Sequence, residues 1–68
     1  MDEQLVNLIG ASEGAVKEFD AWRLEAVQSG LNPSKIQNLK RRGLVHTRIE
    51  NGVHYIVRGK RPANQPEQ

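Results

Sequence analysis

The chain has 68 residues, no cysteine and a net charge of +2, with 37% apolar and 26% charged residues. A chain of this length forms one domain with a small core, and without cysteine it has no disulfide framework and no thiolate metal cluster. It contains no run of 18 apolar residues, and its first residues lack the basic and apolar pattern of a signal peptide. We therefore expect a protein of the cytoplasm, or of the nucleus in a eukaryote, with no membrane partner.

The residues available for catalysis are few. His46 and His54 are the two histidines of the chain, and a body of this size does not enclose a cleft around a nucleophile or a metal-bound water. Two imidazoles without a supporting carboxylate also make a poor metal site. The sequence predicts a binding module, with no enzymatic activity, no metal and no cofactor.

The charge is unevenly distributed along the chain. Residues 1–34 hold six acidic and two basic residues, a net charge of −4, whereas residues 35–61 hold eight basic residues and one acidic residue, a net charge of +7. An acidic half joined to a basic half predicts one face that binds a polyanion. The alternative is a solvated surface that is basic without a binding role.

The first predicted helix covers residues 2–10, where an acidic first turn precedes apolar residues and Gly10 ends the pattern. Residues 11–19 permit two interpretations. Either Ser12 caps a long helix, or residues 15–17 are extended and Asp20 caps a new helix. We leave both interpretations open.

The next two predicted helices are separated by a short turn. The helix that carries Trp22 ends near Ser29, because Gly30 suits the left-handed position that follows a helix. Asn32 is a good N-cap, and Pro33 fits the first helical position, where its missing N–H costs nothing. A helix is therefore predicted over 33–42. Its two apolar residues face inward, and its other residues are polar or basic.

Residues 44–58 predict a β-hairpin around Asn51-Gly52, because β-branched residues flank this turn signal. A two-residue turn pairs Ile49 with His54 and mixes polar and apolar residues on each face. A three-residue loop pairs Ile49 with Val53, and we prefer it because it gathers the apolar residues on one face. That inner face is Val45, Ile49, Val53, Tyr55 and Val57. The outer face is His46, Arg48, His54, Ile56 and Arg58.

The order of helix, tight turn, helix and basic hairpin resembles a winged helix-turn-helix domain. The residues that carry the resemblance are Ala26-x-x-x-Gly30-Leu31, Ile36, Leu39 and Gly43-Leu44-Val45. The segment Arg-Arg-Gly-Leu-Val that leads into a strand is similar to that of compact bacterial and phage regulators. The resemblance implies a small α+β fold of about three helices and a C-terminal hairpin. We assign the domain to residues 1–59 and a flexible tail to residues 60–68.

The resemblance implies binding to double-stranded DNA, as in a small transcriptional regulator. Helix 33–42 would enter the major groove, and hairpin 44–58 would act as the wing. Side chains on that helix can read base edges and contact phosphates, and arginines of a wing suit a narrow minor groove. The expected DNA-binding residues are Ser34, Lys35, Gln37, Asn38, Arg41, Arg42, Arg48, Asn51 and Arg58.

Two other functions stay open. A winged helix can serve as a protein–protein adaptor, here for an acidic partner, and Ile56 on the expected outer face of the hairpin favours this. RNA binding through the same basic surface is a third function. Because one such domain reads few base pairs, specific DNA recognition would also call for a homodimer or another protein partner.

Overall fold

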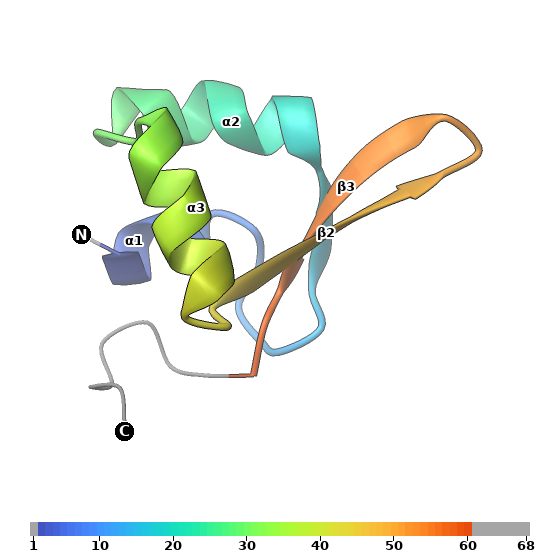
Figure 1. Ribbon diagram of the computed structural model, residues 1–68, viewed down its shortest axis with the longest axis horizontal. Coiled ribbons are helices and arrows are strands. Elements are labelled where there is room, and N and C mark those ends of the chain that lie inside the picture. The colour runs from blue at the N-terminus through green and yellow to red at the C-terminus, as the bar shows by residue number, and fades with distance from the viewer. Residues whose placement is uncertain (1, 61–68) are drawn as a thin grey trace.

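A computed structural model of the chain describes residues 2–60, and these form an α+β domain (Figure 1). This confirms the predicted fold class at the level of α+β. In chain order the elements are α1 (Asp2–Asn7), β1 (Val16–Glu18), α2 (Phe19–Gln28), α3 (Pro33–Arg41), β2 (Val45–Glu50) and β3 (Val53–Arg58). The strands form an antiparallel sheet in the order β1-β3-β2. Of the expected flexible tail, residues 61–68 lie outside the described residues.

Helix α1 is shorter than the predicted helix over 2–10. It ends at Asn7, and the chain continues through a turn in which the Ile9 N–H donates to the Val6 carbonyl at 3.0 Å. Gly10 has a second role besides ending this segment. A Cβ on Gly10 would lie 2.3 Å from the Cβ of Ala15, so this position requires glycine for the loop to close on itself.

The structure decides between the two interpretations of residues 11–19. Val16–Glu18 is a strand, and α2 begins at Phe19, so the extended segment is correct and the long helix from Ser12 is wrong. The strand forms because β3 offers an edge to pair with. Asp20 is not the cap of the new helix, since Glu18 occupies the N-cap position and its side chain makes no capping hydrogen bond.

Helix α2 carries the centre of the core. Trp22 is fully buried, and its indole N–H donates to the Leu5 carbonyl at 2.9 Å, which ties α2 to α1. The helix ends as predicted, because Gly30 has a φ of 99° and the Leu31 N–H reaches back to the Ala26 carbonyl at 3.0 Å. The core consists of Leu5, Val6, Ile9, Trp22, Ala26, Leu31, Leu39, Leu44, Val45 and Ile56.

Helix α3 forms where it was predicted, with its last residue one position earlier. The Asn32 side chain accepts a hydrogen bond from the Lys35 backbone N–H at 2.9 Å, and Pro33 is the first helical residue. Arg42 is the C-cap, and Gly43 follows with a φ of 79°. Local chemistry alone therefore sets both ends of α3.

The hairpin has the other register. The turn is the two-residue Asn51-Gly52, with φ values of 52° and 79°, and it pairs Ile49 with His54 and Thr47 with Ile56. The predicted three-residue loop is wrong. Positive φ at both central positions is the geometry that a two-residue hairpin turn prefers, because its twist matches that of the strands.

The corrected register reverses the faces of β3. Ile56 is fully buried in the core, whereas Val53, Tyr55 and Val57 lie on the opposite face of the sheet. Tyr55 therefore does not face inward as expected. His46 and His54 lie on opposite faces rather than on one, and His54 stacks on the ring of Phe19 with centroids 4.4 Å apart.

Candidate nucleic-acid interface

One side of α3 is exposed to solvent and is polar or basic, apart from Pro33 at its start. Ser34, Gln37 and Arg41 lie three and four residues apart, so they share this side of the helix, as expected. Lys40 lies on the same side and is exposed. In the described part of the chain, the side chains of Lys40 and Arg41 make no hydrogen bond or ion pair. We call Ser34, Gln37, Lys40 and Arg41 the outer side of α3.

The other side of α3 is bound to α1. The Arg42 guanidinium donates to the Asp2 carboxylate at 2.6 Å and to the Asn38 side chain at 3.0 Å. The Lys35 ammonium lies 3.0 Å from the other Asp2 oxygen. Lys35, Asn38 and Arg42, which were expected to contact DNA, therefore make contacts within the fold. We call these three residues the inner side of α3.

Asp2 is the acceptor at the centre of this contact. Its side chain is 18% exposed. The hydrogen bond from Arg42 lowers the pKa of the Asp2 carboxyl below its ordinary value of 3.8, burial acts in the opposite direction, and Lys35 lowers the pKa further. The carboxylate is thus charged at neutral pH and cancels part of the positive charge of α3.

Arg58 also differs from its expected position on the outer face of the hairpin. It pairs with Val45 on the face that bears the core, and it is half-buried. Its guanidinium donates to the Asn7 side chain at 2.8 Å and to the Gly10 carbonyl at 2.6 Å. Arg58 therefore fastens the end of β3 to the loop after α1 and takes no part in the candidate interface.

The hairpin keeps two of its expected residues at the surface. Arg48 and Asn51 are exposed, and the hairpin extends away from the helices, as Figure 1 shows. The Arg48 Nε lies 3.6 Å from a Glu50 carboxylate oxygen, and both side chains are at least half exposed. An exposed ion pair at this distance contributes little to stability, so the Arg48 side chain can turn toward another anion.

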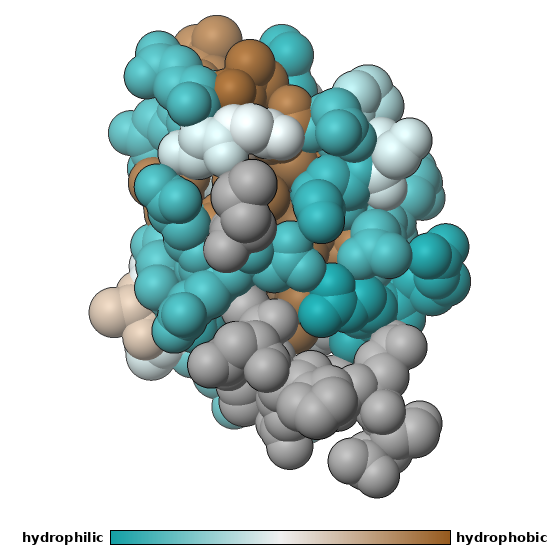
Figure 2. Space-filling view, turned by 90° about the vertical axis from the view of Figure 1, so that its left-hand side faces the viewer, coloured by the Kyte–Doolittle hydropathy of each residue, from teal (hydrophilic) through white to brown (hydrophobic). Residues whose placement is uncertain are grey.

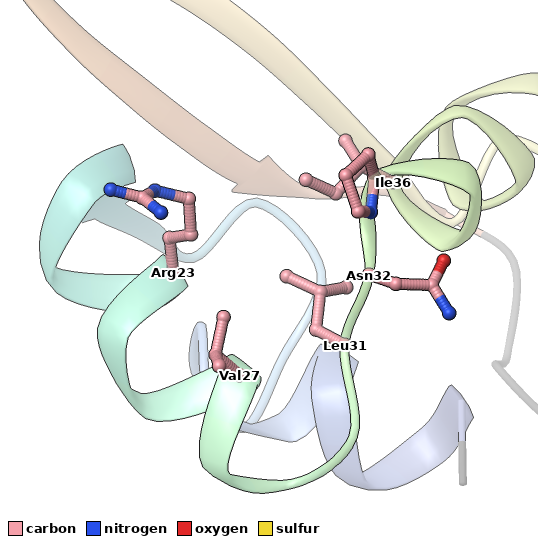
Figure 3. Close-up of a pocket in the computed structure, with 6 residues that line it drawn as sticks. Arg23, Val27, Leu31, Asn32 and Ile36 are labelled. Carbon is pink, nitrogen blue, oxygen red and sulfur yellow. The ribbon is translucent and has the colours of Figure 1, made fainter.

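A shallow hollow of about 80 Å³ lies between α2 and α3. Figure 3 shows Val27, Leu31 and Ile36 pointing into the space between the helices, with Arg23 further along α2. Figure 2 views the side of the molecule where α2 ends and α3 begins, and hydrophobic atoms reach the surface there between hydrophilic ones. Val27 is 52% exposed.

The structure therefore divides the expected site residues into two groups. Ser34, Gln37, Arg41, Arg48 and Asn51 are exposed, whereas Lys35, Asn38, Arg42 and Arg58 are partly buried. Lys40 was missed by the sequence analysis. The signal was available, because Lys40 is three residues after Gln37 and seven after Pro33 on the helix.

Across residues 2–60 no group of three or more metal-ligating side chains comes together. In that same range no helix has the length and apolar character needed to cross a membrane. Comparisons with protein-family models, curated proteins and solved structures give no match to this chain.

Proposed function

We propose that the chain is a winged helix-turn-helix domain that binds double-stranded DNA. The order of elements supports this arrangement, because a strand precedes α2, a short turn joins α2 to α3, and a hairpin follows. The sequence did not decide strand β1. This strand pairs with β3 on the side away from β2, and the resulting three-stranded antiparallel sheet supports the proposal.

The observation that carries the proposal is the composition of the outer side of α3. Its four side chains are neutral polar or cationic, and α3 has no acidic residue. An α-helix fits the major groove, where Gln37 can bond to adenine and Arg41 to guanine. Lys40 is placed to contact a phosphate, since its ammonium acts as a point charge.

The hairpin supplies a second contact in this proposal. Arg48 and Asn51 lie on the part that extends beyond the helices, where they can reach the backbone or a narrow minor groove. With Lys40, Arg41 and Arg48 as the engaged cations, the logarithm of the affinity should fall with the logarithm of salt concentration at a slope of roughly −3. Five engaged cations would give a slope steeper than about −4.

The test is a titration of random duplex DNA, followed by fluorescence anisotropy at several salt concentrations. Arg41→Ala should weaken binding about 5- to 10-fold and flatten the salt slope by roughly 1. The matched control is Arg23→Ala, which removes the same charge from an exposed position on α2 and should leave binding within about 2-fold. Equal effects of both substitutions, or no effect of either, would overturn the proposal. A duplex RNA of the same length, bound more tightly than the DNA, would replace DNA by RNA.

The second candidate function is a protein–protein adaptor. It rests on the hollow between α2 and α3, and no longer on Ile56. Ile56 no longer favours it, because that side chain is buried in the core. The hollow between α2 and α3 favours it instead, because apolar side chains line the hollow and Arg23 stands beside it. This combination suits a peptide with an apolar and an acidic side chain. Val27→Asp should abolish such binding and leave DNA binding within about 2-fold, whereas retained peptide binding would exclude the hollow.

A further inference from the structure

The sheet has an apolar strip on the face turned away from the helices. The register places Val53, Tyr55 and Val57 along the middle of this face, with Val16 beside Val57 on β1. None of these four belongs to the core or packs against it. Val16 is 44% exposed, and the other three are half-buried. We call this the outer sheet face, and its members are Val16, Glu18, His46, Arg48, Glu50, Val53, Tyr55 and Val57.

The charges on this face are arranged asymmetrically about the strip. Glu18 on β1 and Arg48 on β2 both pair with Tyr55, so they lie in one row on opposite sides of it. Both side chains are exposed. Within this row the β1 edge is acidic and the β2 edge is basic, and Glu50, the next residue on this face of β2, lies 3.6 Å from Arg48.

This arrangement is complementary to itself under one particular rotation. A two-fold axis parallel to β3 places the β1 edge of one copy over the β2 edge of the other, because the rotation exchanges the two edges but keeps each row in place. Glu18 of each copy then faces Arg48 of the other, and Tyr55 faces Tyr55. An axis perpendicular to β3 would instead place Glu18 over the same edge of the other copy, acid toward acid.

We propose that two copies of this chain associate through their outer sheet faces, about a two-fold axis parallel to β3. An interface of this symmetry uses the same patch on both copies. The apolar strip supplies the burial that drives association, and two sheets can pack face to face at about 10 Å. The two Glu18–Arg48 pairs fix the orientation rather than most of the affinity.

This association does not require DNA, so it goes beyond the proposed function and is tested without DNA. Arg48 is used in both proposals: in the dimer it pairs with Glu18 of the other copy, and Lys40 and Arg41 on α3 remain as the cations that contact DNA. The outer side of α3 takes no part in the proposed interface. If the DNA proposal also holds, each dimer presents two copies of α3, which is how such domains recognise paired half-sites.

The test uses the full chain without DNA, with sedimentation velocity over a concentration series up to about 1 mM. The wild type should shift with concentration from 7.7 kDa toward twice that mass. Glu18→Arg and Arg48→Glu, each alone, should raise the dissociation constant about 10-fold or more, because each brings like charges together across the interface. The combined variant should restore wild-type association, because it exchanges the two edges and recreates both pairs.

A matched control comes from the opposite face of the same hairpin. Ile49 is 70% exposed and pairs with His54, away from the outer sheet face. Ile49→Thr should leave the association unchanged, whereas Tyr55→Thr should weaken it without loss of strand content in circular dichroism. A chain that stays monomeric throughout, or a combined variant that fails to restore association, would overturn the proposal.

Discussion

The two sides of α3 carry the same kinds of residue and have different roles. On the inner side, Lys35 and Arg42 converge on Asp2 and hold α1 against α3. On the outer side, Lys40 and Arg41 point to solvent and make no such contact among residues 2–60. A run of basic residues in the sequence therefore does not show how many of them are available to bind a ligand. The position of a single acid, 40 residues from Arg42 in the chain, decides which cations are free to bind.

The largest expected difference in stability between the two sides of α3 comes from Arg42 on the inner side. Arg42→Ala should lower the free energy of unfolding by about 2–3 kcal/mol, because it removes charge-assisted hydrogen bonds and leaves the largely buried Asp2 carboxylate with one cation. Urea denaturation measures this loss. Arg41→Ala is the control on the outer side and should change stability by less than about 0.5 kcal/mol. Equal losses in the two variants would remove the distinction between the sides.

In the hairpin, Arg58 makes contacts within the fold, as Arg42 does in α3, whereas Arg48 is exposed. Arg58→Ala should cost about 2 kcal/mol, because the half-buried guanidinium loses its bonds to Asn7 and Gly10, and the Gly10 carbonyl loses a donor. The melting temperature should fall by about 8–16 °C for a domain of this size. Arg48→Ala, on the exposed face of β2, should move it by no more than a few degrees. A larger effect at Arg48 than at Arg58 would contradict the assigned roles.

The turn of the hairpin tests whether positive φ at Asn51 and Gly52 contributes to the stability of the domain. Gly52→Val should destabilise the domain by about 1–2 kcal/mol, because valine is strained at a φ of 79° even though no atom lies within 4 Å of the added Cβ. Asn51→Gly should stay within about 0.5 kcal/mol, since glycine also accepts positive φ. Thermal melts of the two variants give the comparison. A neutral Gly52→Val would mean that the turn relaxes freely.

The smallest expected effect is the pH dependence of the stability that the Asp2 carboxylate contributes through its contact with the inner side of α3. Because the pKa of Asp2 is lower in the folded protein, the stability from this carboxylate is fully present above pH 3.8 and is lost as the pH falls through the lowered pKa. Asp2→Asn should cost about 1 kcal/mol at pH 7. The difference between the two proteins should shrink below pH 3.8. A difference that stays constant to pH 2 would contradict the role of the charge.

The parts of the fold that could be predicted from sequence are those set by local chemistry. Asn32-Pro33 and Gly43 gave the ends of α3, and Gly30 gave the end of α2. The register of the hairpin was not predicted, because β3 has apolar residues on both faces and grouping them by type favoured the wrong loop. The Asn-Gly pair itself was the better signal, since it suits positive φ at both central positions.

The candidate site was predicted only in part, because some of its expected residues make contacts with residues far away in the sequence. Helical spacing alone places Ser34, Gln37 and Arg41 on one side of α3. The contacts that withdraw Arg42 and Arg58 join residues 40 to 51 positions apart. No local pattern encodes such contacts, because they depend on where α1 packs once the core has formed.

The hairpin is buried at its base and exposed at its turn. At its base Val45 and Ile56 are fully buried, and Gly59 packs so closely that a Cβ there would lie 2.1 Å from the Gly43 carbonyl oxygen. Further out, the ring of His54 rests on Phe19, while Ile49 beside it is 70% exposed. The base thus anchors the hairpin to the core, and the turn at Asn51 and Gly52 lies exposed beyond it. A molecule that contacts the turn therefore meets a surface separate from the helix that begins at Pro33.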